Sequence, residues 1–109
     1  MNKYKAKRVT VDGINFASIR ESNRYLTLKM LGRSGKIKSL ELQPAFLLMV
    51  KDGVHIKTPT GRNMKYLADF RYTENGKTVI EDVKGYDTKV SAIKRAVVEA
   101  YYDIKINLI

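Results

Sequence analysis

The chain has 109 residues, 44% of them hydrophobic, which suffices for one modest core but not for two. No apolar run approaches the roughly 18 residues of a membrane span, and no apolar segment follows the basic start as in a secretory signal. The absence of cysteine excludes disulfides, cysteine-bound zinc and thiol catalysis. We therefore expect one cytoplasmic domain over residues 1–109, without a membrane partner.

The net charge of +10 arises from 21 Lys and Arg residues against 11 Asp and Glu residues. Such an excess attracts polyanions and favours binding to phosphate backbones. The alternative is a basic surface without a specific partner. Acidic side chains at a site that meets an anionic partner would need a counter-charge, and a bound metal ion would supply it.

The first part of the chain predicts an arm and a hairpin. Residues 1–8 are basic and lack periodicity, which predicts a flexible arm. Asp12 and Gly13 lie between the short apolar runs 9–11 and 14–16. Asp-Gly between such runs is typical of a tight β-hairpin.

A helix should follow this hairpin. Ser18 and Glu21 have the spacing of a capping box, so the helix should begin at Ser18 and run to about residue 31. Gly32 or Gly35 could end it. Apolar residues at helical spacing predict its buried face: Ile19, Tyr25, Leu26 and Met30.

The middle of the chain predicts three strands. The first covers residues 40–50, with an edge position or a bulge at Gln43-Pro44. Two more, at about 64–73 and 77–84, should form a hairpin around the turn-rich residues between them. The polar segment 51–63 predicts a mobile loop, in which the single histidine, His55, is exposed and not catalytic.

A second helix and a final strand complete the prediction. Asp87 or Thr88 could cap a helix that ends near Tyr101. Its predicted buried stripe is Val90, Ile93, Val97, Ala100 and Tyr101. The last strand, 104–109, should run parallel to strand 77–84, because a helix connects them. The fold class is then α/β (α+β): a mixed β-sheet flanked by helices, in the order hairpin, helix, three strands, helix, strand.

Two acidic segments carry the most informative pattern in the chain. Asp69 lies in YLADFRY, and Asp82 and Lys84 lie in TVIEDVKG, on the two strands of the predicted hairpin. Side chains two residues apart on a strand share one face, so Asp82 and Lys84 should lie together. Asp69, which its apolar neighbours predict to be buried, can sit beside them. Two carboxylates and an amine would bind a divalent cation and hold water or phosphate next to it. The alternative is an ordinary ion pair.

Strand alternation separates Asp82 from its neighbour Glu81. One face should carry Ile80, Asp82 and Lys84, and the other Val79, Glu81 and Val83. Glu81 would then pair with a Lys or Arg elsewhere. A bulge would exchange Glu81 and Asp82, so either could be the residue that faces the site.

Three further polar residues could flank this site. Glu21 is either a capping residue alone or a site residue that reaches from the first helix. Gln43 is either a surface residue or a neutral partner at the site. Lys94 is either a solvated helix lysine or a cation that meets a phosphate.

The chain resembles a small phage-encoded family within the PD-(D/E)xK nuclease superfamily, some of whose relatives resolve branched DNA. The resemblance covers nearly the whole chain, through five segments in the same order: DGINFASIRESNRYLTLKML, LELQPAFLL, YLADFRY, TVIEDVKG and AIKRAVVEAYY. It implies a restriction-endonuclease-like core, a mixed sheet flanked by helices.

The resemblance also implies roles for single residues. Asp69 matches the first strand aspartate of the superfamily, and Asp82 and Lys84 match the acid and lysine of its (D/E)xK element. Glu21 matches a helix acid that some members add to the metal site. Gln43 and Lys94 match polar positions that flank the site. Ala68 replaces the proline of the motif, and Glu81 beside Asp82 leaves the choice of ligand open.

We therefore expect a Mg²⁺-dependent endodeoxyribonuclease, with Mn²⁺ as a substitute cofactor. Asp69, Asp82 and Glu21 would hold the metal, while Lys84 orients or deprotonates the attacking water. By resemblance, the substrate would be duplex or branched DNA, such as a Holliday-junction-type recombination intermediate of a phage in its bacterial host. Cutting paired strands would favour a homodimer.

Three alternatives belong to other functional classes. A nucleic-acid-binding module could keep the nuclease fold without cutting. A phage inhibitor protein could use the basic face on an acidic protein partner. A metal phosphoesterase could act on small nucleotides, although the high charge suits a long polymer better.

Overall fold

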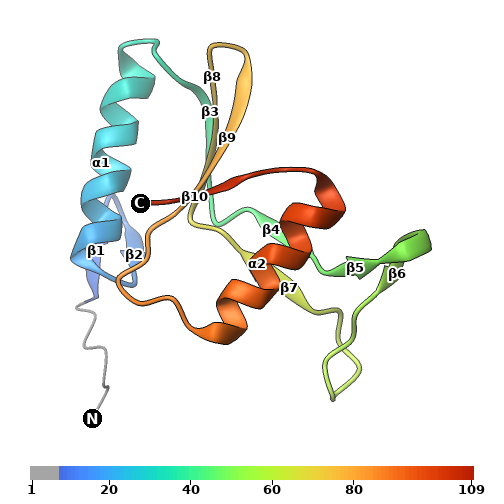
Figure 1. Cartoon of the computed structure of the whole chain (residues 1–109). Helices are drawn as coiled ribbons and strands as arrows, with labels where there is room; N and C mark the ends of the chain where they lie inside the picture. The colour runs from blue at the N-terminus through green and yellow to red at the C-terminus, as the bar shows by residue number, and fades with distance from the viewer. Residues whose placement is uncertain (1–7) are drawn as a thin grey trace.

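The computed structural model describes residues 8–109 (Figure 1). The predicted basic arm at residues 1–8 therefore lies outside the described residues, except for the exposed Arg8. Within residues 8–109, no helix has the length and apolar character needed to cross a membrane.

A four-stranded mixed sheet forms the centre of the molecule, in the order β10-β9-β8-β3. Its strands are β3 (Lys38–Leu42), β8 (Phe70–Glu74), β9 (Lys77–Asp82) and β10 (Ile106–Leu108). β8 and β9 form the predicted antiparallel hairpin. β10 pairs with β9 in parallel, with Ile106 opposite Ile80, which confirms the predicted pairing of the last strand.

The two helices cover opposite faces of this sheet, α1 (Ile19–Arg33) on one and α2 (Lys89–Tyr102) on the other. Val79 packs in the core cluster that contains Leu28 of α1, whereas Ile80 packs in the cluster that contains Val98 of α2. Adjacent strand residues point to opposite faces, so the two clusters lie on the two sides of β9. The fold is therefore α+β, a mixed sheet flanked by helices, as predicted.

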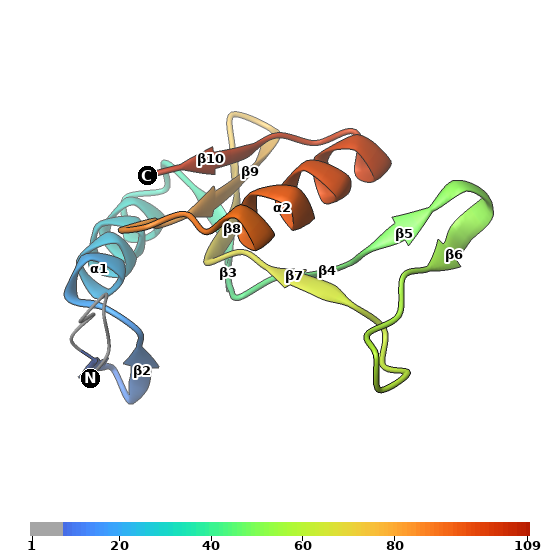
Figure 2. The ribbon, with the colours of Figure 1, turned by 60° about the horizontal axis from the view of Figure 1, so that its bottom comes forward.

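Three two-stranded antiparallel pairs lie outside this central sheet (Figure 2). β1 (Val9–Val11) and β2 (Ile14–Phe16) form the predicted hairpin, with Asp12 and Gly13 both at positive φ in its turn. β4 (Ala45–Leu47) pairs with β7 (Lys65–Leu67), and β5 (Met49–Val50) pairs with β6 (Val54–His55). The short 3₁₀ turn η1 (Lys51–Gly53) joins β5 to β6.

The strand predicted at residues 40–50 is wrong in its length, because the chain leaves the sheet at Gln43. Gln43 has a φ of 51°, and Pro44 has no N–H to donate to a ladder. The predicted strand 64–73 is broken in the same region, at Ala68 and Asp69. The Gln43 N–H donates to the Asp69 carbonyl at 2.9 Å, so the two breaks lie side by side.

The segment 51–63, which its composition predicts to be a mobile loop, contains short elements of secondary structure. It contains η1, β6 and an isolated antiparallel bridge between Lys57 and Asn63. His55 is half-buried rather than exposed, because it lies in β6 opposite Met49. Its Nδ1 is buried and has no hydrogen-bond partner within residues 8–109.

The predicted buried faces of the helices are only partly correct: Tyr25 of α1 is buried and Val97 of α2 packs against the core, but the other predicted residues are exposed. Ile19, Leu26 and Met30 of α1 are exposed, and α1 buries instead Glu21, Ser22, Tyr25 and Leu28. Val90, Ile93 and Tyr101 of α2 are exposed too, while Val98 is fully buried. The physical reason is shared: polar side chains on the sheet-facing side of each helix pair with charged residues of β9 and its surroundings. Apolar spacing therefore placed most of the predicted buried residues on the outer side of each helix.

Candidate active site

A cleft of about 670 Å³ lies where the N-termini of both helices meet the end of β9. Its walls include Glu21 from α1, Asp69 from the junction of β7 and β8, and Asp82 and Lys84 from the end of β9. The fold thus brings together the four residues that the sequence singled out as catalytic. Arg20 also lines this cleft.

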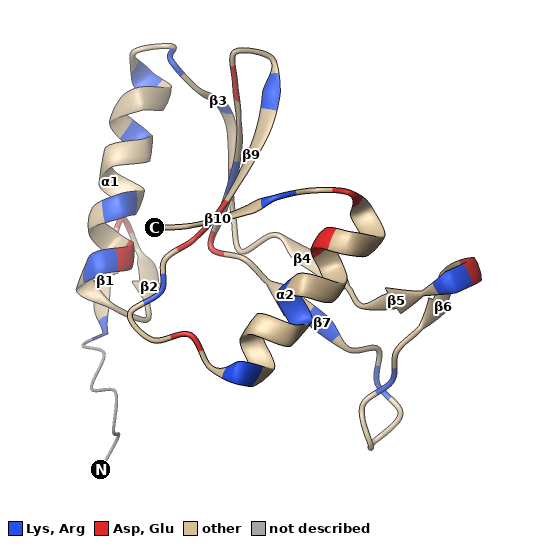
Figure 3. Cartoon of the chain, viewed as in Figure 1, with Lys and Arg blue, Asp and Glu red and all other residues tan. Residues whose placement is uncertain are grey.

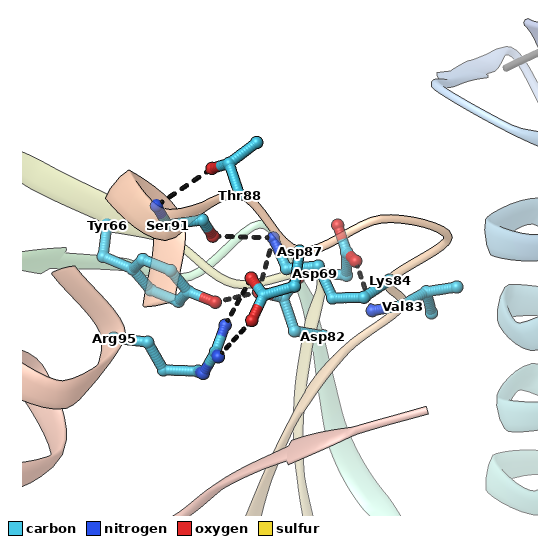
Figure 4. Close-up of polar contacts among 9 residues, drawn as sticks. All are labelled: Tyr66, Asp69, Asp82, Val83, Lys84, Asp87, Thr88, Ser91 and Arg95. Atoms are coloured by element: carbon cyan, nitrogen blue, oxygen red, sulfur yellow. Dashed lines mark hydrogen bonds and ion pairs between the residues drawn. The ribbon is translucent and has the colours of Figure 1, made fainter. Parts of the chain in front are cut away.

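Asp69 is held in place by the break between β7 and β8. Its N–H donates to the Glu81 carbonyl at 3.0 Å, and its carbonyl accepts the Gln43 N–H. Its carboxylate Oδ2 accepts the backbone N–H of Val83 at 2.7 Å (Figure 4). The residue is half-buried in this junction, whereas the sequence placed it inside a continuous strand.

Asp82 and Lys84 lie together, as strand alternation predicted. The Lys84 Nζ is 3.3 Å from Asp82 Oδ2 and donates to Ser91 Oγ at 3.1 Å. The Tyr66 hydroxyl donates to the same Asp82 Oδ2 (Figure 4). Asp82 is 2% exposed, so these two donors compensate its buried charge.

Glu81 points to the opposite face of β9, toward α1. Arg24 donates to it from Nε at 2.8 Å and from Nη2 at 2.5 Å, and the Tyr72 hydroxyl donates to it at 2.5 Å. Burial and this contact raise the pKa of Tyr72 to about 12. The exchange of Glu81 and Asp82 by a bulge therefore does not occur, and Asp82 is the acid that faces the cleft.

Glu21 takes part in the N-terminal cap of α1 and also lines the cleft. Its backbone N–H donates to Ser18 Oγ at 3.1 Å, which confirms Ser18 as the N-cap of α1. Its side chain is buried at the cleft wall. Burial and the charge of Asp82 raise the pKa of Glu21, against a hydrogen bond from the Ala17 backbone that lowers it.

The carboxyl group of Asp69 is the most perturbed acid of the cleft. Burial is the largest cause, followed by a hydrogen bond with the Asp82 side chain, and together with nearby negative charge they raise its pKa to about 8. The Val83 N–H opposes this shift. Three acids crowded at one place therefore keep a proton that an isolated aspartate would lose.

The structure places the two flanking residues differently. Gln43 is exposed and lines a separate cavity of about 100 Å³, which Glu21 and Asp69 also border. Lys94 is not among the residues that line the cleft. The residue of α2 that contacts the site is Ser91, whose hydroxyl accepts a hydrogen bond from Lys84. The backbone N–H of Ser91 donates to the side chain of the N-cap residue Thr88.

Sequence reasoning missed Tyr66, Ser91 and Arg95. Arg95 donates to both oxygens of Asp87, at 3.0 and 2.6 Å, and ties the start of α2 to the loop after β9. The spacing of Ser91 and Arg95, four residues apart on one helix face, was a usable signal. Tyr66 gave none, since its contact with Asp82 depends on how β7 lies against β9.

The donor set suits a hard divalent cation. Glu21, Asp69 and Asp82 offer only carboxylate oxygens, the ligands that Mg²⁺ and Mn²⁺ prefer. A cation would also stabilise the ionised forms of Glu21 and Asp69, whose pKa values are raised by burial and, to a smaller extent, by nearby negative charge. Among residues 8–109, however, no three acidic or histidine side chains already converge on a metal position. Binding would therefore require the carboxylates to turn from their present partners.

Comparison with known proteins gives one match. A model of the family described as "Protein of unknown function (DUF1064)" matches residues 1–109. No curated protein and no solved structure matches the chain significantly.

Proposed function

We propose that this chain, which belongs to the DUF1064 family, is a metal-dependent endodeoxyribonuclease. The observation that carries the proposal is the meeting of Glu21, Asp69, Asp82 and Lys84 at one cleft. These residues come from three separate parts of the chain. Their meeting in a protein with a net charge of +10 favours chemistry on a phosphate polymer.

In this proposal Lys84 is the group that contacts the reacting phosphate or the attacking water. Its Nζ lies between the carboxylate of Asp82 and the hydroxyl of Ser91, so its position is fixed from two sides. An ammonium group there would neutralise charge on a phosphate oxygen or hold a water molecule for attack. Arg20, whose guanidinium donates to the Lys84 carbonyl at 3.1 Å, adds a second cation at the cleft.

Asp69 and Asp82, with Glu21, would hold a divalent cation. Once bound, Mg²⁺ or Mn²⁺ would act as a Lewis acid and stabilise negative charge on the phosphate oxygens. The backbone N–H of Val83 and the hydroxyl of Tyr66 hold the two aspartates at the cleft, and the carboxylates would turn from these donors to bind the cation. The donor chemistry and the raised pKa values support this assignment.

The DNA partner follows from the charge and from the resemblance of the sequence. Lys and Arg residues lie along α1, at the start of α2 and on the segment between β6 and β7 (Figure 3). Such dispersed cations bind the backbone without reading bases. By the resemblance to PD-(D/E)xK nucleases, we propose a restriction-endonuclease-like core, branched DNA as substrate, and a phage protein that acts in the bacterial cytoplasm.

A DNA-binding module that does not cut is the second candidate. The observation in its favour is that Asp82 already accepts from Tyr66 and Lys84, and Asp69 from Val83. A site whose carboxylates are satisfied within the protein can exist without a metal.

A cleavage assay separates the two candidates. Labelled four-way junction, flap and linear duplex DNA would be incubated with Mg²⁺, Mn²⁺ or EDTA, with wild-type protein and the Lys84→Ala variant. We expect cutting that requires metal and falls at least about 100-fold in the variant, because general acid–base and electrostatic groups contribute on that scale. Lys77→Ala is the matched control, since Lys77 is an exposed lysine at the start of β9, whereas Lys84 follows the end of that strand.

The outcomes of this assay are distinct. Metal-dependent cutting that persists in Lys77→Ala and disappears in Lys84→Ala supports the nuclease. Salt-sensitive DNA binding without cutting under any metal supports the binding module and removes the catalytic roles of Asp69, Asp82 and Lys84.

A further inference from the structure

The connection between β6 and β7 forms a hairpin of its own, the basic hairpin of residues 57–63. Lys57 and Asn63 form an antiparallel bridge at its base, and the Lys57 side chain donates to Asn63 Oδ1. At its tip the Gly61 N–H donates to the Thr58 carbonyl at 2.9 Å, which closes a β-turn. The basic hairpin therefore has a defined shape that its own hydrogen bonds maintain.

A triangle of backbone hydrogen bonds fixes the base of this hairpin. The Leu48 N–H donates to the Met64 carbonyl at 2.9 Å, and the Met64 N–H donates to the Ile56 carbonyl at 2.8 Å. The Ile56 N–H donates to the Leu48 carbonyl at 2.9 Å and closes the triangle. Leu48 is buried in the core cluster that contains Val98, and Ile56 and Met64 pack against this cluster. The basic hairpin thus projects from a packed, hydrogen-bonded base.

Positive charge is concentrated on this projection. Residues 56–68 include Lys57, Arg62 and Lys65 but no acidic residue. All three cations are exposed, and none takes part in an ion pair within residues 8–109. Since no carboxylate of the described chain neutralises these cations, they attract an anionic partner.

The neighbouring hairpin of β5 and β6 leaves the same triangle but lacks this charge excess. Its turn carries Lys51 directly before Asp52, and both residues are exposed. Opposite charges at adjacent positions attract a polyanion less than an uncompensated cation does. Charge therefore distinguishes the basic hairpin from a neighbour that projects from the same base.

We propose that the basic hairpin enters the major groove of duplex DNA beside the cleft, where Arg62 and Lys57 bind the DNA. The major groove is about 12 Å wide and admits a two-stranded β-ribbon. The tip consists of Thr58, Pro59, Thr60 and Gly61, so no long side chain blocks its entry. The identity of the partner rests on the proposed function, and the basic hairpin specifies which part of the protein holds the DNA next to the cut.

The path of the chain limits the distance between this contact and the cleft. Leu67 at the end of β7 lines the cleft, and six positions separate it from Gly61. An extended chain of that length spans at most about 20 Å. DNA rises about 3.4 Å per base pair, so the groove contact should lie within about six base pairs of the phosphate in the cleft. The tip points to the same side of the molecule as the N-terminal ends of α1 and α2, which border the cleft (Figure 1).

DNA binding measured without cutting tests this contact. Fluorescence anisotropy with labelled duplex and four-way junction DNA in EDTA would give the dissociation constants. We expect Arg62→Ala to raise the dissociation constant about tenfold, as the loss of one good groove contact does. Lys51→Ala removes an equal charge from the neighbouring hairpin and should leave the dissociation constant unchanged. Equal effects of the two substitutions would overturn the proposal, because they would reflect net charge alone.

Methylation interference locates the contact on the DNA. Dimethyl sulfate methylates guanine N7, which lies in the major groove. We expect a patch of guanines whose methylation weakens binding of the wild-type protein and of Lys51→Ala but not of Arg62→Ala. A wild-type pattern without such guanines, or an unchanged pattern in Arg62→Ala, would overturn the proposal. Equal urea unfolding midpoints of Arg62→Ala and the wild-type protein would show that the variant is folded, since the Arg62 side chain is exposed.

These measurements separate failure of the groove contact from failure of the proposed function. Lys84→Ala should retain the sensitive guanines, because this substitution removes a group of the cleft and leaves the basic hairpin intact. A patch that depends on Arg62 in a protein that never cuts DNA would contradict the nuclease alone. Metal-dependent cutting by a protein whose DNA affinity does not depend on Arg62 would contradict the groove contact alone.

Discussion

Asp69 shows how the tertiary structure changes the chemistry of a single residue. Its backbone fills the junction between β7 and β8, and its carboxyl group is held by the Val83 N–H beside Asp82 and Glu21. An isolated aspartate is ionised at neutral pH, but burial and neighbouring acids raise the pKa of Asp69 to about 8. A strongly shifted acid in a cleft is a marker of functional sites.

This shift predicts a pH dependence of stability in the absence of divalent cations. The folded protein retains a proton on Asp69 that the unfolded chain releases above its ordinary pKa of 3.8, so the stabilisation is complete below about pH 4. This stabilisation is lost as the pH rises toward about 8. The free energy of unfolding should fall by at most ~1.4 kcal/mol per pH unit, because one proton is involved. The free energy of unfolding, measured with urea between pH 4 and 8, should therefore depend less on pH for Asp69→Asn than for the wild-type protein.

Asp52→Asn serves as the control for this experiment. Asp52 is exposed in the turn between β5 and β6, so its substitution should leave the slope unchanged. If the free energy of unfolding depends on pH equally in the wild-type protein and in Asp69→Asn, Asp69 titrates as an ordinary aspartate.

At the scale of the elements, an ion pair beneath the cleft joins α1 to β9. Arg24 of α1 holds the carboxylate of Glu81, which is 2% exposed. The pair explains why the sheet-facing side of α1 is partly polar. It also aligns the helix that carries Glu21 with the strand that carries Asp82.

We predict that Arg24→Ala destabilises the protein by about 3 kcal/mol, because the substitution leaves a buried charge with Tyr72 as its remaining side-chain donor. Arg71→Ala is the matched control: Arg71 makes an equivalent two-point contact with Glu41, but that carboxylate is 52% exposed, so its loss should cost at most ~1 kcal/mol. Urea unfolding midpoints at equal m-values would measure both. If both substitutions lower the free energy of unfolding by the same amount, the burial of Glu81 does not strengthen its contact with Arg24.

At the scale of the whole molecule, the excess of positive charge should govern DNA affinity. Each phosphate contact contributes about 0.9 to the slope of log affinity against log salt for duplex DNA. Arg20 lies at the rim of the cleft and donates to the carbonyl of Lys84. We predict that Arg20→Ala reduces this slope by about one for every DNA sequence, as measured by fluorescence anisotropy between about 50 and 200 mM salt.

An exposed lysine far from the cleft provides the comparison. Lys38 of β3 borders a separate cavity near the turn between β8 and β9. Lys38→Ala should leave the salt slope unchanged if DNA binds across the cleft. If Lys38→Ala reduces the salt slope more than Arg20→Ala does, the DNA binds at the opposite end of the sheet.

The sequence by itself determined the features that rest on local interactions. Asp12-Gly13 predicted the first hairpin, Ser18 and Thr88 predicted the helix caps, and strand alternation placed Asp82 with Lys84 and away from Glu81. These features depend on backbone conformations and hydrogen bonds between residues only a few positions apart. The mixed sheet flanked by helices also followed, because a helical connection between β9 and β10 requires a parallel pair.

Only the tertiary structure decided which side of each helix faces the sheet and which residues complete the cleft. The inward sides of α1 and α2 carry polar residues such as Arg24 and Arg95 beside the buried Leu28 and Val98, so hydrophobic periodicity alone did not identify them. The contact of Tyr66 with Asp82 joins residues from two different sheets, and the breaks at Gln43 and Asp69 stabilise each other across the chain. These outcomes depend on contacts between residues distant in sequence, whose energies no local pattern contains.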